Sequence, residues 1–428
     1  MRWPFHIGIK SDFKSGSVGY EKIPPDWTGQ LQLLVIQPSP FCNLDCDYCY
    51  LPDRNNTIRM ELKTLEIAAK KIFSANLPAR DLSVVWHAGE PLVVSRDWYE
   101  SAFDILSENC SSSVRITHNF QTNGVLIDTN WISFFRNHDV RLGVSLDGPA
   151  WLHDKHRRTR DFRGTHARVM KGIDKLKETE MPFHVICVLT RESLDHPDEI
   201  FDFFSNLKPQ QLCFNIEEVE AANSTSSLAT NHLETEKAFR IFMTQIVKRA
   251  SLLRNDHALL NDEISSVKER PTESVNRRMR IREIDDIIYA LRHPAFGKQK
   301  GNSQNIPGQI LNLASDGRFS TFSPELLGQI APNIGDLSLG NVHFDQIPPN
   351  SQEKKYVLQW EAIQEGVKRC KETCSYFDLC LGGSPSNKLG ETESFESTET
   401  LYCKLTKKIM IEVVLNALDN ELPHRDLC

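Results

Sequence analysis

Three cysteines close together in the N-terminal half carry the clearest chemistry in this sequence. Cys42, Cys46 and Cys49 are separated by three and by two residues and directly follow an apolar run. Three thiolates on one loop can bind three irons of a 4Fe–4S cube and leave the fourth iron without a protein ligand. An open coordination position is typical of a catalytic metal, because another molecule must bind there. A zinc knuckle is the alternative, but it needs a fourth protein ligand, and the nearest histidines are distant in the sequence.

A second group of cysteines lies near the C-terminus. Cys370, Cys374, Cys380 and Cys403 supply four thiolates, which can close a tetrahedral zinc site or bind every iron of a 4Fe–4S cluster. The spacing alone does not separate the two. The chain has 11 cysteines, an odd number with uneven spacing. In a reducing compartment, such tight groups indicate metal ligands rather than disulfides.

The composition limits the possible partners. The chain of 428 residues has a formal charge of −7, which gives no general reason to expect nucleic-acid binding. The most apolar run, Ile409 to Leu418, is interrupted by Glu412 and Asn416 and is too short to span a bilayer. The N-terminus lacks the apolar segment of a secretory signal. We therefore expect a soluble, cytoplasmic protein that binds neither nucleic acid nor membrane.

Between about residues 31 and 218 the chain alternates strand-like and helix-like segments. The predicted strands are short and mostly apolar, as expected for strands buried on both faces. They cover Leu31–Gln37, Leu82–Trp86, Val114–Phe120, Val140–Leu146, Phe183–Thr190 and Gln211–Glu217. The helical patterns between them cover Leu62–Phe73, Ile127–Asn137, Ala167–Glu178 and Pro197–Phe204. This alternation predicts a parallel α/β sheet, either open or curled into a partial barrel.

The character of the sequence changes near residue 220. A polar linker is followed by predicted helices at Glu234–Leu253 and Ile281–Arg292, and then by a possible hairpin around Asp316 and Gly317. The arginine-rich run 277–282 suggests either a solvated helix start or a grip on an acidic peptide. We expect four parts: an N-terminal extension (1–30), a core (31–220), a helical bridge (221–300) and a C-terminal domain (301–428).

The first cysteine group resembles the signature of the radical S-adenosylmethionine (SAM) enzymes, with Tyr48 just before the last cysteine. In that family the amino and carboxylate groups of SAM bind the unique iron. The reduced cluster then cleaves SAM to a 5′-deoxyadenosyl radical, which abstracts a substrate hydrogen. The resemblance covers about residues 31–218 and implies a partial (β/α)6 TIM-like barrel within the α/β class.

Segments at the ends of later predicted strands match the same family in order. Ala88, Gly89 and Glu90 resemble a Gly-Gly-Glu-Pro segment that receives the SAM amino group, with Ala88 in place of the first glycine. The resemblance implies that Gln121 lies near the cofactor. It also implies that Ser145 contacts the SAM ribose or carboxylate, and that Arg157 pairs with the carboxylate, a role that Arg158 or Arg160 can also fill. Taken singly, such segments can be ordinary turns.

The second cysteine group resembles the SPASM extension of peptide-modifying radical SAM enzymes, which usually carries two auxiliary clusters. All ligands of one of these clusters are missing here; Ser384, for example, stands at one of the ligand positions. The resemblance therefore implies a C-terminal helical and SPASM-type iron–sulfur extension with one auxiliary 4Fe–4S cluster.

The SPASM extension, the stretch STFSPELLG and the pattern CSYFDLCLGGSPSNK resemble maturases that form cyclophanes in glycine-rich ribosomal peptides. This resemblance implies a cross-link between a side-chain carbon and an aromatic ring, with the auxiliary cluster accepting or passing on an electron. The implied partners are a ribosomally made precursor peptide and an electron donor such as ferredoxin or flavodoxin. Glu325 lies where relatives carry an acidic catalytic residue, although an exposed loop carboxylate is the simpler interpretation. The alternatives are a formylglycine-forming sulfatase-maturating enzyme, a thioether-forming enzyme and a non-catalytic zinc-site binding protein.

Overall fold

The computed structural model describes residues 24–253, 279–292 and 301–421 of the chain. Residues 1–23 of the expected N-terminal extension lie outside the described residues. So do residues 254–278 and 293–300 of the expected helical bridge, including the first two arginines of the run 277–282.

All six strands predicted for the core are present, each overlapping its predicted range. They are β1 (Leu31–Ile36), β2 (Pro78–Trp86), β3 (Arg115–Thr122), β4 (Arg141–Ser145), β5 (Phe183–Leu189) and β6 (Gln211–Ile216). Neighbours pair in parallel from β1 to β6. Every residue of β5 is buried, which explains why its sequence is a continuous apolar run rather than an alternating one.

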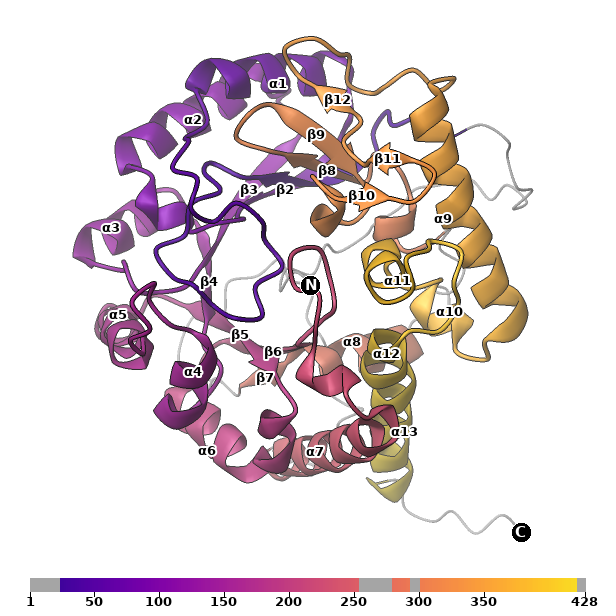
Figure 1. Cartoon of the computed structure of the whole chain (residues 1–428). Coiled ribbons are helices and arrows are strands. Elements are labelled where there is room, and N and C mark those ends of the chain that lie inside the picture. The colour runs from indigo at the N-terminus through magenta and orange to yellow at the C-terminus, as the bar shows by residue number, and fades with distance from the viewer. Residues whose placement is uncertain (1–23, 254–278, 293–300, 422–428) are drawn as a thin grey trace.

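The sheet continues beyond these six strands at both edges. Its order is β12-β9-β8-β1-β2-β3-β4-β5-β6-β7. The added strands are β7 (Arg280–Ile281), β8 (Ile310–Leu313), β9 (Arg318–Thr321) and β12 (Gly340–Asn341). Figure 1 shows the sheet curled around a central space, with its two edge strands unpaired to each other. The fold is therefore a partial barrel, as predicted.

Helices cover the outer side of the barrel (Figure 1). They are α1 (Leu62–Ser74), α2 (Arg96–Asn109), α3 (Thr129–Asn137), α4 (Ala150–His156), α5 (His166–Glu178), α6 (Pro197–Leu207), α7 (His232–Leu253) and α8 (Arg282–Arg292). Helix α6 begins at Pro197 with Asp198 and Glu199 in its first turn, where a fixed φ and negative charge favour a helix start. The apolar faces of these helices and the sheet share one continuous core.

The last two arginines of the run 277–282 form ion pairs within the chain. Arg282 is 4 % exposed, donates to the carbonyl oxygen of Phe214 and pairs with Glu283. Arg280 pairs with Asp285 at 2.8 Å. Arg282 is therefore not solvated at the helix start, and its guanidinium is not exposed for binding a peptide.

The C-terminal part begins with the β8–β9 hairpin, and the predicted turn at Asp316 and Gly317 is present with Gly317 at φ +87°. A second, two-stranded sheet pairs β10 (Ile330–Ala331) with β11 (Gly335–Asp336). The helices that follow are α9 (Lys354–Thr373), α10 (Phe377–Cys380), α11 (Pro385–Thr392), α12 (Leu401–Cys403) and α13 (Met410–Glu421). A π-helical turn over Lys404–Ile409 joins α12 to α13, and α13 packs against α7. Within the described residues, no helix combines the length and the apolar character that crossing a bilayer requires.

Candidate active site

The first cysteine group lies on the loop that leaves the carboxyl end of β1. Cys46 is 8 % exposed, and the sulfur of Cys42 accepts hydrogen bonds from the backbone N–H of Leu44 at 3.5 Å and from Asn123 Nδ2 at 3.8 Å. Burial and the carboxylate of Glu90 raise the pKa of Cys42 to about 12. A cation at the sulfurs is therefore needed to hold this thiol as a thiolate at neutral pH.

Two arginines fasten the cysteine loop through its backbone. Arg54 Nη1 donates to the carbonyl oxygen of Cys46 at 2.9 Å, and Arg160 Nη2 donates to that of Cys42 at 2.8 Å. Arg158 instead donates to the carbonyl oxygen of Asp154 at 3.1 Å. The sequence offered Arg158 and Arg160 as alternative partners for the SAM carboxylate. In the structure both side chains donate hydrogen bonds to backbone carbonyl oxygens.

The Ala88–Glu90 segment packs directly against the chain that leads into the cysteine loop. Ala88 and Gly89 both have positive φ, at +67° and +93°. A Cβ on Gly89 would lie 2.4 Å from the carbonyl oxygen of Ser39 and 2.7 Å from that of Phe41, so only glycine fits this close approach. Ala88 adopts the same left-handed region despite its side chain.

The carboxylate of Glu90 joins the ends of β2 and β3. It is 1 % exposed and accepts from Leu92 N at 3.0 Å, Thr122 Oγ1 at 2.6 Å and Asn123 N at 2.8 Å. Burial raises the pKa of Glu90 to about 7. A carboxylate has about four acceptor positions, so these contacts leave one position on Oε2.

Gln121 and Ser145 meet on neighbouring strands. Gln121 Nε2 donates to Ser145 Oγ at 3.0 Å, across the β3–β4 pairing in which Gln121 lies opposite Gly143. Both residues lie near the carboxyl ends of parallel strands, where ligand-binding side chains gather in such sheets.

Arg157 is buried in an ion pair with Asp147. Its Nε and Nη2 donate to the two carboxylate oxygens at 3.0 and 3.2 Å, and Asp147 Oδ1 also accepts from Val188 N at 2.9 Å. The hydroxyl of Tyr48 donates to Asp147 Oδ2, and the guanidinium lies 5.4 Å from the centre of the Tyr48 ring. Burial acts to raise the pKa of Asp147, but the charge of Arg157 together with His153, the Tyr48 hydroxyl and the Val188 N–H outweighs it, so the net pKa is lowered. Sequence reasoning did not assign Asp147 a role.

Glu325 belongs to an acidic cluster, which we call the carboxylate cluster: the buried Glu220 and Glu325 and the half-buried Glu218. Glu325 is 2 % exposed, so the interpretation as an exposed loop carboxylate is wrong. Burial raises the pKa of Glu325 and also that of Glu220. Tyr50 lies close enough to the cluster for Glu325 to affect it: burial, and after it the charge of Glu325, raises the pKa of the Tyr50 hydroxyl. This hydroxyl is 3.1 Å from His87 Nε2.

Tyr50 connects the carboxylate cluster with the first cysteine group. Tyr50 directly follows Cys49, whose charge also contributes to the raised pKa of Tyr50 after burial and Glu325. Sequence reasoning missed Tyr50, His87, Glu218 and Glu220. A signal was present for the two glutamates, since both follow the carboxyl end of β6, where polar residues were expected at the other strands.

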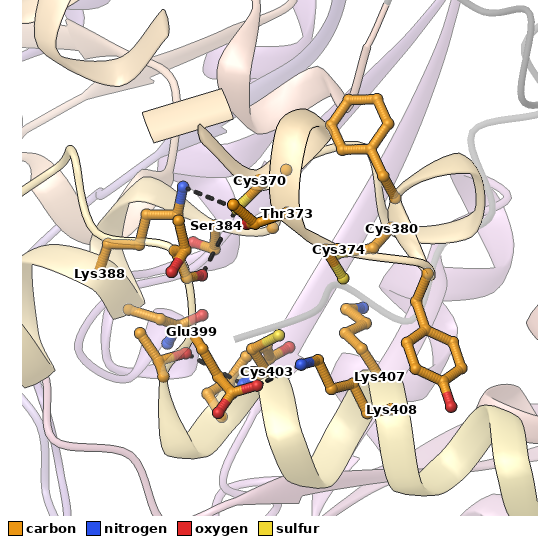
Figure 2. Close-up of a pocket in the computed structure, with 18 residues that line it drawn as sticks. Cys370, Thr373, Cys374, Cys380, Ser384, Lys388, Glu399, Cys403, Lys407 and Lys408 are labelled. Atoms are coloured by element: carbon orange, nitrogen blue, oxygen red, sulfur yellow. Dashed lines mark hydrogen bonds and ion pairs between the residues drawn. The ribbon is translucent and has the colours of Figure 1, made fainter. Parts of the chain in front are cut away.

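The four C-terminal cysteines line one cavity of about 300 Å³ (Figure 2). Cys370 lies in the last turn of α9, Cys374 directly follows that helix, and Cys380 and Cys403 are the last residues of α10 and α12. Among the described residues, no three His, Cys, Asp or Glu side chains converge tightly enough to hold a single metal ion. A 4Fe–4S cube binds each thiolate at a different corner, so it does not require such convergence.

Ser384, which stands where the sequence lacks an expected cluster ligand, belongs to a network of buried serines. Ser384 Oγ lies 3.0 Å from Ser323 Oγ and 2.8 Å from Ser386 Oγ. Asn302 and Asn305 add hydrogen bonds to the carbonyl oxygen of the neighbouring Gly383. We call Ser323, Ser384 and Ser386 the serine network.

Comparison with known proteins decides the family. The model of the radical SAM superfamily matches residues 36–204, the span that holds the cysteine loop and strands β2 to β5. An uncharacterised protein of Synechocystis sp. is 39 % identical over 401 residues, which cover 92 % of this chain and 94 % of that protein. This chain belongs to the radical SAM superfamily. It is a radical SAM enzyme.

Other relatives of this radical SAM enzyme match a smaller part of it. The serine-type anaerobic sulfatase-maturating enzyme of Klebsiella aerogenes is 33 % identical over 184 residues, which are 42 % of this chain and 45 % of that enzyme. Among solved structures, anSMEcpe with bound AdoMet and Cp18Cys peptide has a TM-score of 0.68 at 20 % identity, covering 91 % of this chain and 98 % of that one. Streptococcus suis SuiB bound to precursor peptide SuiA has a TM-score of 0.56 at 16 % identity, covering 88 % and 76 %. At these identities the two structures establish a shared fold.

Proposed function

We propose that this radical SAM enzyme cross-links a ribosomally made precursor peptide, joining a side-chain carbon to an aromatic ring to form a cyclophane. The observation that carries the proposal is the burial of the Glu325 carboxylate near Tyr50, the residue that directly follows Cys49. A carbon–carbon cross-link to a ring needs a base close to the radical chemistry, and Glu325 is suited to that role.

The first site fits a 4Fe–4S cluster and SAM by the chemistry of its donors. Cys42, Cys46 and Cys49 supply three thiolates to the cluster. Glu90 keeps one acceptor position for the SAM amino group, beside the backbone of Ala88 and Gly89. The other residues proposed to line the SAM site are Tyr48, Gln121, Ser145 and Arg157. When bound, SAM and the iron–sulfur clusters supply hydrogen-atom abstraction and one-electron transfer.

Arg157 fits this site in a different way from the one first expected. Two of its nitrogens are used by Asp147, so a SAM carboxylate would have to bind the remaining N–H groups of the guanidinium. Asp147 thereby sets the orientation of the guanidinium fork.

The second site fits one auxiliary 4Fe–4S cluster better than zinc. A cavity that holds one water molecule measures about 10–15 Å³ on the same scale, and a zinc ion is smaller, whereas the cavity between the four cysteines has about 300 Å³. The serine network supports a count of one auxiliary cluster rather than two. Ser384, which stands at one expected ligand position of a further cluster, is paired with two other buried hydroxyl groups.

The reaction balances with Glu325 as the proton acceptor. One hydrogen leaves the side-chain carbon as an atom, for which the radical derived from SAM would be the acceptor, and the carbon radical adds to the ring. The ring carbon then loses one electron, for which the auxiliary cluster would be the acceptor, and one proton, which Glu325 takes up. The raised pKa of buried Glu325 makes its carboxylate a stronger base than an exposed glutamate. The proposal also includes an external one-electron donor such as ferredoxin or flavodoxin. The peptides bound in the structures of anSMEcpe and SuiB support a peptide substrate.

The test is co-expression with a short glycine-rich peptide that contains an aromatic residue and no cysteine, taken from a neighbouring reading frame. We expect the peptide to lose the mass of two hydrogen atoms per modification. Tandem mass spectrometry should find no backbone fragments between the aromatic residue and its partner. The matched variant Glu325→Gln keeps the shape of the side chain and removes the base, so it should retain SAM cleavage and lose the cross-link.

Two results would contradict the cyclophane, and a third would contradict the role of Glu325. An aldehyde that reacts with a hydrazine probe, formed at a cysteine or serine, would indicate formylglycine synthesis, the alternative raised by the sequence. A modification that requires a peptide cysteine would indicate a thioether. If Glu325→Gln forms the full amount of cross-link, the proposed cyclophane product stands, but Glu325 is not the base.

A further inference from the structure

The cavity of the second cysteine group is lined by an excess of positive charge. Figure 2 shows Lys388, Lys407 and Lys408 around the cavity together with the four cysteines. Among the described residues that line it, Glu399 is the one carboxylate. Lys408 already pairs with Glu399, so the two other lysines have no carboxylate of the lining to balance them.

Lys407 is the most informative of the three. Its side chain is 6 % exposed, and its Nζ has no hydrogen-bond partner within the part of the chain that the structure describes. In Figure 2 the side chain extends from its helical turn toward Cys374. Lys407 Nζ lies 5.9 Å from the centre of the Tyr402 ring. Burying an ammonium group without a hydrogen-bond partner costs several kcal/mol as an order of magnitude, because the charge loses its hydration. An anionic occupant of the cavity would remove this penalty.

Lys388 approaches the same cavity from the opposite side. It lies on α11, is 4 % exposed, and its Nζ donates to the sulfur of Cys370 at 3.5 Å. This is a direct contact between a buried ammonium group and one of the four thiol sulfurs.

The backbone explains how a lysine on the same helical segment as Cys403 reaches the cavity. A π-helical turn over Lys404–Ile409 follows Cys403 directly. A π turn closes over one more residue than an α turn, so residues four and five positions after Cys403 both face its side. These residues are Lys407 and Lys408. Such turns are rare and occur frequently at functional sites.

We propose that Lys388 and Lys407 are charge partners of the auxiliary cluster and raise its reduction potential, so that the cluster can take up an electron. This rests on the proposed presence of that cluster. An iron–sulfur cube with four thiolate ligands is negatively charged, and its negative charge grows by one when it accepts an electron. Two fixed cations therefore stabilise the reduced form more than the oxidised form. Net charge and hydrogen bonds to sulfur are established determinants of such potentials.

The test measures the potential of this cluster alone. The full-length chain carrying Cys42→Ala, Cys46→Ala and Cys49→Ala is reconstituted without oxygen and titrated by electron paramagnetic resonance. Adding Lys407→Met keeps the unbranched stem and removes the charge. We expect full iron content and at least a tenfold lower ratio of reduced to oxidised cluster at a fixed potential, which corresponds to about 59 mV for one electron. Lys388→Met should shift the potential in the same direction.

Two matched variants separate charge from structure. Lys407→Arg keeps the cation and should titrate close to the background chain. Lys404→Met removes a lysine of the same π turn that pairs with Glu236 and Glu399 and does not line the cavity, and it should have no effect. If Lys407→Met loses the cluster while Lys407→Arg keeps it, the need for a cation is supported.

Three outcomes would overturn the inference. Full iron content with an unchanged potential in Lys407→Met and Lys388→Met would exclude the charge partnership and leave the cluster in place. An equal shift in Lys404→Met would show a general effect of surface charge, and loss of the cluster from both Lys407 variants would show a role in packing. Zinc, or no metal, in the background chain would instead contradict the proposed auxiliary cluster itself.

Discussion

At the scale of single residues, Arg157 shows how an ion pair changes the meaning of a candidate ligand. Arg157→Ala would leave the buried carboxylate of Asp147 without its cation, and breaking such a pair costs about 3 kcal/mol or more. We therefore expect urea unfolding to show a loss of about 3 kcal/mol in Arg157→Ala. Adding Asp147→Asn should restore part of it, because a neutral amide is cheaper to bury.

The neighbouring arginine provides the control for this prediction. Among the described residues, the side chain of Arg158 donates to the carbonyl oxygen of Asp154, and Arg158→Ala should change the free energy of unfolding by less than about 1 kcal/mol. Equal stability of Arg157→Ala and the wild type would mean that the ion pair contributes nothing. The affinity of Arg157→Ala for SAM should be calculated from the folded fraction of the protein, so that a loss of stability is not mistaken for a loss of binding.

His153 makes the same site sensitive to acid. Its Nδ1 accepts from Asp147 N at 3.3 Å, and its Nε2 lies 3.0 Å from Thr165 Oγ1, which itself donates to the carbonyl oxygen of Arg157. The imidazole is thus held neutral, with its proton on Nε2. Burial lowers the pKa of His153 to about 3.

The sign of the pH effect follows from this lowered pKa. Between about pH 3 and 6.5 the unfolded state binds a proton that folded His153 does not, so stability falls as the pH falls through that window. From pH 7 to pH 5 we expect the wild type to lose about 2 kcal/mol more than His153→Asn, whose side-chain oxygen can replace Nδ1 as acceptor. Parallel pH profiles of unfolding for the two proteins would contradict this.

At the scale of elements, the β2–α2 connection sets the position of the cysteine loop. Ala88→Gly should raise the free energy of unfolding by about 0.5–1 kcal/mol, because alanine is strained at φ +67°. Gly89→Ala should lower it by about 3 kcal/mol, since its Cβ would meet two backbone oxygens of the segment before Cys42. It should also reduce iron binding at the first cysteine group.

The pair Ala88→Gly and Gly89→Ala is its own control, because adjacent positions receive opposite changes. Thermal unfolding together with iron analysis of the first site would decide the matter. If Gly89→Ala keeps wild-type stability, the close approach of the two segments is not required.

The elements that could be predicted from the sequence are those specified by local patterns. Strands such as β5 are apolar on both faces, and α6 carries its start signal in Pro197, Asp198 and Glu199. Helix α9 over Lys354–Thr373 was not predicted, because its apolar residues alternate with many charged ones. The pairing of Arg157 with Asp147 was missed for a different reason: it depends on where α4 returns to the end of β4.

Glu325 shows what only the tertiary structure could supply. Its local sequence, a Ser-Pro-Glu turn, is that of an exposed loop. It becomes buried in a fold in which β8 pairs in parallel with β1 and the β8–β9 hairpin leads into the turn. Leu33 of β1 and its partner Ile310 of β8 are 277 positions apart, and no periodicity in the sequence records such a pairing.

At the scale of the whole molecule, one sheet links the two proposed metal sites. The first lies at the carboxyl end of β1, and the second lies among helices α9 to α12 that follow the β8–β9 hairpin. The two cysteine groups share no residue and are held by different contacts: arginine donors to backbone carbonyls at the first, and buried lysines at the second. We therefore expect each to fill with iron independently of the other.

This independence predicts iron counts. The wild type should hold about eight iron atoms per chain, from two 4Fe–4S clusters. The Cys42→Ala, Cys46→Ala and Cys49→Ala chain and the Cys374→Ala, Cys403→Ala chain should each hold about four. Ser384→Cys should leave the wild-type count unchanged, because one thiolate cannot replace the four ligands of a further cluster and its neighbours Ser323 and Ser386 remain hydroxyls. Iron for three clusters in the wild type would contradict the interpretation of the serine network, and loss of all iron from the Cys374→Ala, Cys403→Ala chain would show that the first site depends on the second.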